Sequence, residues 1–152
     1  MKTSRTVVFI FFAVLLAACQ SGTPEPLNAI VNTEFTLSEG KKVELRDAGI
    51  AITFISLSGD SRCPLGMECA MSGPVTVSLS IRDQSGTEST EVLQTFTDIK
   101  GLAPEMEFEG IKDRITVGEY QIKIISVLPY PEKKTFSIGE PNYELGLKVT
   151  KE

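Results

Sequence analysis

The sequence predicts an all-β fold, an antiparallel β-sandwich of about seven or eight strands with immunoglobulin-like architecture. From residue 34 onward, short segments alternate between apolar and polar residues, with turn-forming residues between them. This region contains no convincing amphipathic helical pattern. A small open β-barrel is the alternative architecture for the same pattern. The length fits a single domain over residues 34–152.

The first predicted strands lie at residues 35–37 and 43–45, where apolar and polar residues alternate. Residues 50–57 are apolar on both faces, which indicates a central buried strand. Residues 75–81 alternate cleanly, which indicates a strand with one buried face and one solvated face.

The second half of the domain continues in the same way. Asp83-Gln84-Ser85-Gly86 predicts a hairpin turn into a strand at residues 90–96. A long strand is expected at residues 120–128 and a last one at residues 143–149. Gly118 precedes Tyr120 by two positions, which resembles the tyrosine corner of Greek-key sandwiches.

Composition excludes several classes of function. The net charge of −5 argues against nucleic-acid binding, which needs clustered positive charge. The chain has no histidine, so histidine-based catalysis and imidazole metal sites are excluded. Glu105, Glu107 and Glu109 alternate and are expected on one solvated strand face. The sequence therefore predicts neither an enzyme nor a cofactor.

The N-terminus has the pattern of an export signal. Lys2 and Arg5 precede an apolar run over residues 7–18, which is too short to cross a bilayer as a helix. The run ends in Leu16-Ala17-Ala18-Cys19, which resembles the lipobox of bacterial lipoproteins. The resemblance implies that residues 1–18 are a signal peptide and that Cys19 receives a diacylglycerol group.

Such a lipid would attach the protein to the bacterial cell envelope, since two or three acyl chains hold a protein firmly on a membrane. Gln20 stands where an aspartate would resemble an inner-membrane retention signal. This favours the outer membrane in a diderm bacterium, facing the periplasm or the cell surface. Residues 19–33 are expected to be the lipidated cysteine and a flexible tether.

Cys63 and Cys69 are the two cysteines that remain if Cys19 is lipidated. An oxidising compartment beyond the cytoplasmic membrane favours a structural disulfide between them. The alternative is a soft-metal site for Cu(I), because Cys63, Met67, Cys69 and Met71 offer two thiolates and two thioethers. A thioredoxin-like redox site normally has fewer residues between its cysteines.

A second resemblance lies in the same segment. The motif reads Asp60-Ser61-Arg62-Cys63-Pro64, followed by Cys69 and Gly73. It is similar to a motif of small bacterial lipoproteins, in which a tryptophan usually stands where this chain has Met71. The resemblance implies a secreted, disulfide-bearing β domain and implies no activity.

The sequence thus predicts a membrane-anchored envelope lipoprotein with a non-catalytic β-sandwich. We expect a binding or structural module whose partner is an envelope protein, a glycan or a small ligand. The soft-metal lipoprotein is the alternative function.

Overall fold

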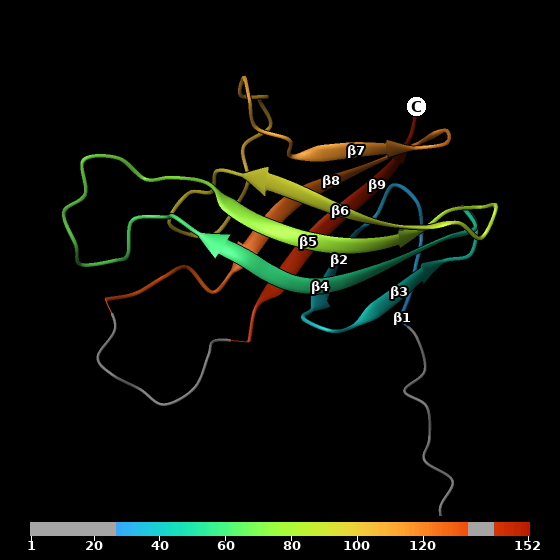
Figure 1. Cartoon of the computed structure of the whole chain (residues 1–152), viewed down its shortest axis with the longest axis horizontal. Helices are drawn as coiled ribbons and strands as arrows, with labels where there is room; N and C mark the ends of the chain where they lie inside the picture. The colour runs from blue at the N-terminus through green and yellow to red at the C-terminus, as the bar shows by residue number, and fades with distance from the viewer. Residues whose placement is uncertain (1–26, 134–141) are drawn as a thin grey trace, which may run out of the picture.

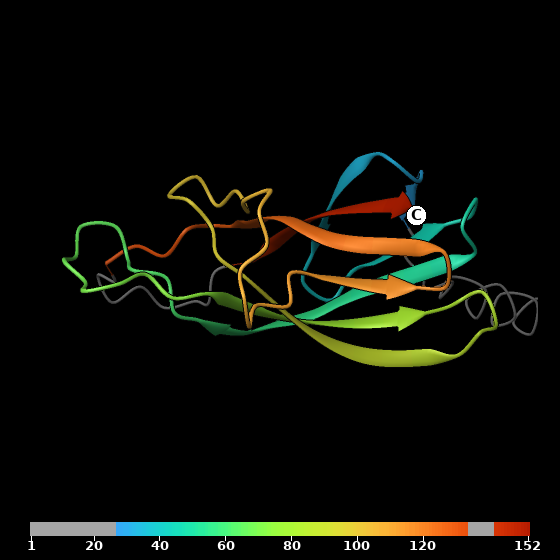
Figure 2. The ribbon, with the colours of Figure 1, turned by 90° about the horizontal axis from the view of Figure 1, so that it is seen from above.

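The computed structural model describes residues 27–133 and 142–152, and within them the chain is an all-β sandwich. A five-stranded and a four-stranded sheet pack face to face, as Figures 1 and 2 show. The sandwich predicted from the alternation is confirmed, and the open-barrel alternative is not observed. The described residues contain no helix long and apolar enough to cross a membrane.

Nine strands are described, slightly more than predicted. They are β1 (Leu27–Ala29), β2 (Glu34–Ser38), β3 (Lys42–Leu45), β4 (Ile50–Asp60), β5 (Val75–Arg82), β6 (Glu88–Thr95), β7 (Arg114–Val117), β8 (Tyr120–Leu128) and β9 (Glu144–Lys151).

The strand order is β1-β3-β4-β5-β6 in the larger sheet and β2-β9-β8-β7 in the smaller one. Strands β3 to β6 are consecutive antiparallel neighbours, whereas β1 pairs with β3 in parallel. The immunoglobulin-like detail is not confirmed, because four consecutive strands in the larger sheet are neighbours, unlike the ABED and CFG sheets of that fold.

The tyrosine-corner interpretation also fails. Tyr120 follows a two-residue turn between β7 and β8 within one sheet. In the described residues its phenol makes no hydrogen bond to the backbone, and the Lys151 Nζ lies 6.0 Å from the ring centroid.

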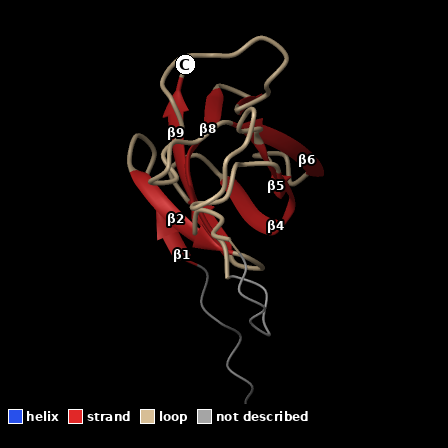
Figure 3. Cartoon of the chain, turned by 90° about the vertical axis from the view of Figure 1, so that its left-hand side faces the viewer, coloured by secondary structure: helices blue, strands red, loops and turns tan. Residues whose placement is uncertain are grey.

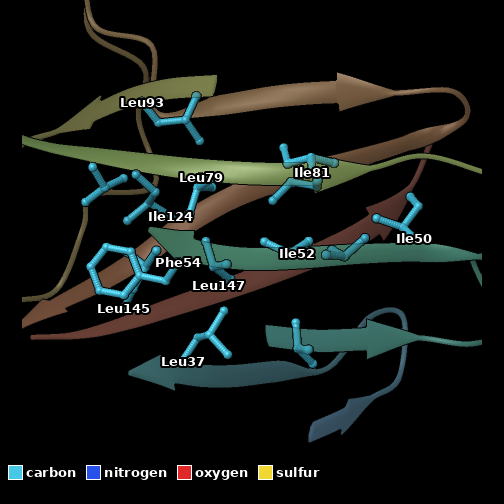
Figure 4. Close-up of a cluster of buried hydrophobic side chains, with 14 of the residues drawn as sticks. Leu37, Ile50, Ile52, Phe54, Leu79, Ile81, Leu93, Ile124, Leu145 and Leu147 are labelled. Atoms are coloured by element: carbon cyan, nitrogen blue, oxygen red, sulfur yellow. The ribbon is translucent and has the colours of Figure 1, made fainter. Parts of the chain in front are cut away.

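The core lies between the two sheets, where every second side chain of the long strands points inward (Figure 4). Its largest side chains are fully buried. They include Leu37, Ile52, Phe54, Leu79, Ile81, Leu93, Ile122, Ile124, Leu145 and Leu147. Ile55 is 41% exposed despite the prediction that residues 50–57 are buried on both faces, because it follows the inward-pointing Phe54 and lies on the outer face of the sheet.

The folded domain begins earlier than the tether prediction placed it. Leu27–Ala29 forms β1, and Ala29 and Val31 pack against the core. The backbone N–H of Val31 donates to the Asp47 carboxylate at 3.0 Å. The segment from Leu27 to Val31 is therefore attached to the sandwich through β1 and through the packing of Ala29 and Val31.

The three alternating glutamates do not lie on a strand. They belong to the irregular connection between β6 and β7, where Glu105 pairs with Lys123 at 3.3 Å and Glu107 with Arg114 at 2.9 Å. Alternation over a few residues did not form a strand here, since this connection contains turns, one of them at Gly110 with a φ of 80°.

Candidate functional site

The Asp-Ser-Arg part of the motif forms a buried ion pair at the end of β4. The Arg62 side chain is fully buried, and the Asp60 carboxylate is 12% exposed. The two groups meet in a fork, with Nε of Arg62 2.8 Å from Oδ1 and Nη2 2.6 Å from Oδ2. Such a bidentate arrangement fixes the plane of the guanidinium.

The remaining donors of Arg62 reach across to the end of β8 and its neighbours. Nη1 donates to the carbonyl oxygen of Val127 at 2.8 Å and to the hydroxyl of Thr97 at 3.4 Å. Nη2 donates to the carbonyl oxygen of Pro129 at 3.1 Å. The Tyr130 ring lies over the guanidinium, with its centroid 5.0 Å from Cζ.

These contacts use all five N–H donors of the guanidinium. Arg62 therefore joins the two sheets at one end of the sandwich. We call this arrangement the Arg62 clamp: Arg62, Asp60, Thr97, Tyr130 and the carbonyls of Val127 and Pro129. A buried arginine with every donor engaged has no group left with which to bind a ligand.

The base of the loop between β4 and β5 extends the strand pairing. The backbone N–H of Ser61 donates to the carbonyl of Pro74 at 3.1 Å, and that of Gly73 donates to the carbonyl of Ser61 at 2.9 Å. A side chain at Gly73 would bring its Cβ within 2.7 Å of the Ser61 Cβ. The glycine of the motif thus permits the close approach of the two sides of the loop.

The disulfide between Cys63 and Cys69 closes the loop, with Cα atoms 5.9 Å apart, as predicted. Pro64 accepts a hydrogen bond at 3.1 Å from the backbone N–H of Met67. Gly66 lies in this turn with a φ of 78°, a conformation that glycine adopts without strain.

The loop also pairs with the segment that follows β8. The backbone N–H of Leu65 donates to the carbonyl of Pro131 at 2.9 Å, and that of Lys133 donates back to Leu65 at 3.2 Å. A long connection of this kind is usually pinned or functional. This one is pinned by the clamp, by the disulfide and by a short parallel bridge.

The far part of the loop exposes three large apolar side chains, which we call the apolar tip. Leu65 is 42% exposed, Met67 51% and Met71 86%. Figure 1 shows the loop extending beyond the ends of β4 and β5, and Figure 3 looks onto this end of the molecule. The position where the similar lipoproteins carry tryptophan is thus on the surface in this chain.

The soft-metal alternative requires the reduced form of the loop. In the oxidised form both thiols are consumed by the disulfide, and Met67 and Met71 offer only two exposed thioethers. The described residues contain no group of three or more His, Cys, Asp or Glu side chains placed to hold a metal ion.

Sequence reasoning singled out Asp60 and Arg62 within one motif, but it missed the partners of Arg62 outside that motif. Thr97 and Tyr130 lie 35 and 68 positions away from it, and the other partners are backbone carbonyls. Pro129 and Pro131 on either side of Tyr130 are typical of the end of a strand, but they indicate nothing about a contact with Arg62. Cys19, the predicted lipidation site, lies outside the described residues.

A shallow depression of about 480 Å³ lies beside residues 107–114, near the β6–β7 connection. Its charges are already paired, since Arg114 contacts both Asp113 at 2.8 Å and Glu107 at 2.9 Å. The hydrogen bond with Asp113 raises the pKa of Arg114 above its usual value. This depression therefore presents no converging unpaired groups that could perform chemistry.

No family model matches the chain, and comparisons with curated proteins and with solved structures found no match.

Proposed function

We propose that this protein is a bacterial envelope lipoprotein, anchored through Cys19, whose non-catalytic sandwich presents the apolar tip to a protein partner. The observation that carries the proposal is the contrast within residues 60–73. Arg62 is entirely engaged in holding the loop, whereas Met67 and Met71 are held at the surface.

The chemistry of the tip favours a protein partner over a glycan or a small polar ligand. Apolar side chains gathered on a soluble protein mark interaction sites, and methionine adapts its shape to a partner's surface. Because the disulfide and the clamp already restrict the loop, docking would cost less conformational entropy than docking of a free loop.

The placement of the loop agrees with a role away from the membrane. Strand β1, where the described chain begins, lies in the half of the molecule opposite the loop (Figure 1). Removal of residues 1–18 eliminates Lys2 and Arg5 and no acid, so the net charge changes from −5 to −7. An acidic domain is repelled by an anionic membrane surface, which leaves the tip free for a partner.

The anchor is tested by changing Cys19→Ser in the full chain and fractionating cells. We expect an unprocessed or soluble product, whereas the unchanged chain partitions into the detergent phase and carries acyl chains by mass spectrometry. A processed Cys19→Ser protein that stays on the membrane would contradict the lipid anchor.

The role of the tip is tested by placing a photo-crosslinking amino acid at Met67 in the source bacterium. We expect a discrete adduct with one protein, and we expect Met71→Asp in the same chain to abolish it. Lys42, on the outer face of the larger sheet, is the matched exposed control. Equal crosslinking from Lys42 and Met67, or an adduct unaffected by Met71→Asp, would refute the proposed docking surface.

A further inference from the structure

Strand β6 is the outermost strand of the larger sheet, and one of its sides faces no other strand over most of its length. Its pairing with β5 is regular from Glu88 to Thr95. The backbone N–H of Gln94 points away from β5, since it donates to the carbonyl of Lys112 at 2.8 Å. Residues two apart on a strand point their backbone groups the same way, so those of Val92, Thr90 and Glu88 also point outward.

The other sheet edges in the described residues have fewer unpaired backbone groups facing outward. Strands β1 and β7 have three and four residues. Just after β2, the backbone N–H of Glu39 donates to the carbonyl of Tyr143, just before β9, at 3.2 Å. By alternation, the backbone groups of Glu34 and Thr36 therefore face outward. Ser38 is the next residue of β2 whose backbone groups face outward, and its carbonyl already accepts a hydrogen bond from the backbone N–H of Lys41. Strand β6 therefore carries the longest open edge.

This edge lacks the usual features that prevent strands from pairing between molecules. Sheet edges are commonly protected by prolines, lysines or bulges, and β6 contains none of them. Its two charged residues are Glu88 and Glu91. Glu88 accepts a hydrogen bond from the Ser80 hydroxyl, and Glu91 pairs with Lys112 at 3.0 Å. Both carboxylates thus have partners within the same chain.

We propose that two copies of this protein pair through their β6 edges, antiparallel and centred on Thr90, to form one continuous sheet. In this register Thr90 lies opposite Thr90 of the second copy, and Glu88 lies opposite Val92. Each of these pairs exchanges two N–H···O=C bonds. The intervening positions place Ser89 opposite Glu91, so no two like charges face each other.

The charge pattern selects this register. A shift of the pairing centre to Glu91 would place that carboxylate opposite its own copy, which is destabilising in a sheet. A shift of the centre to Ser89 would leave Val92 without a partner and would remove two of the hydrogen bonds. The pairing uses a surface remote from the apolar tip, so it stands independently of the proposed function.

The first test is Thr90→Cys in the full chain, exported and treated with a mild oxidant. Residues in a hydrogen-bonded antiparallel pair have Cα atoms about 5.5 Å apart, within the range that a disulfide spans. We expect several-fold more crosslinked dimer than from Thr36→Cys, which places the same change on the open edge of β2. Equal yields from the two variants would overturn the proposal.

The second test addresses the register. Glu88→Cys and Val92→Cys should each crosslink poorly alone, because neither faces its own copy, and should crosslink strongly when the two chains are coexpressed. Thr90→Lys should convert the dimer to a monomer in analytical ultracentrifugation of the detergent-solubilised protein, because two ammonium groups would meet at the twofold axis. A wild-type protein that sediments as a monomer, or a coexpressed pair that crosslinks no better than either variant alone, would refute the pairing.

Discussion

Strand β5 is joined to β4 by a loop and to β6 by a turn. These two connections are held by different kinds of contact. The turn between β5 and β6 is held by local contacts, since the Asp83 carboxylate accepts the backbone N–H groups of Ser85 at 2.8 Å and Thr87 at 2.9 Å. The loop between β4 and β5 is held by distant contacts, since Arg62 bonds to the carbonyls of Val127 and Pro129.

The difference shows what each connection depends on. The partners of Asp83 are two and four positions away, so the turn can form before the sandwich does. The partners of Arg62 on the other sheet are 65 and 67 positions away, so the clamp exists only when both sheets are in place. We therefore expect changes in the clamp to lower the global stability more than changes in the turn do.

The largest effect is expected from Arg62→Ala, which should lower the free energy of unfolding by about 3–5 kcal/mol, because it leaves the largely buried Asp60 carboxylate without its partner. Denaturant unfolding of the purified protein measures this loss. Arg82→Ala is the matched control, since Arg82 is half exposed and lies 3.6 Å from Glu44. The control should lose no more than about 1 kcal/mol. Equal losses in the two variants would show that the clamp does not join the sheets.

The disulfide should contribute less to the free energy of unfolding than the Arg62 clamp does. Closing a seven-residue loop stabilises the folded state by about 2.4 kcal/mol in the chain-entropy model. The double change of Cys63 and Cys69 to Ser should therefore lower the unfolding free energy by about this amount and leave the Arg62 contacts in place. Thiol titration of the native, unreduced protein is the independent check. Two free thiols at these positions would refute the disulfide and restore the soft-metal interpretation.

Much of the fold could be predicted from the sequence because local alternation determines it. Residues 75–81 and 120–124 alternate regularly, and both lie in strands. The hairpin at Asp83 was predictable for the same reason, since its partners are close in sequence. The prediction that residues 50–57 are buried on both faces failed at Ile55, because the outer face of this sheet is not covered there.

The candidate site was only partly predictable. The pairing of Cys63 with Cys69 followed from their number and compartment, and it is present. The burial of Arg62 could not be foreseen, because an arginine is usually exposed. Apart from Asp60, its partners are distant in the sequence, and two of them are backbone carbonyls, which leave no trace in the sequence. The strand at Leu27–Ala29 was missed because Pro24, Pro26 and Asn28 are typical of a tether and obscured its short pattern.

Two glycines show the same contrast, because each is required for a different reason. Gly86 in the local turn has a φ of 86° and open space around it, whereas Gly73 is required because Ser61 occupies the space of a side chain. Gly86→Ala should lower the free energy of unfolding by about 1–2 kcal/mol through backbone strain. Gly86→Asn should lower it less, because asparagine adopts this conformation more readily.

At Gly73 the order of the two variants should reverse, with alanine less destabilising than asparagine. Gly73→Ala should cost about 1–3 kcal/mol through overpacking, and Gly73→Asn should cost more because its side chain is larger. Thermal unfolding of the four variants provides the comparison. The same ranking of Ala and Asn at both positions would show that the two glycines serve one purpose.

The smallest effect concerns the protonation of the Asp83 carboxylate in the turn between β5 and β6. The hydroxyl of Ser85, followed by the backbone N–H groups of Thr87 and Ser85, lowers the pKa of Asp83 below 3.8, against partial desolvation. A carboxylate whose folded pKa is lowered stabilises the turn above its unfolded pKa and loses this contribution as the pH falls through the folded pKa. NMR titration of the Asp83 side-chain carbon should show this lowered pKa, and Ser85→Ala should raise it toward 3.8. Because the turn is local, the resonances of Arg62 should not change through the same titration step. A simultaneous change at Arg62 would show that the two connections of β5 are coupled after all.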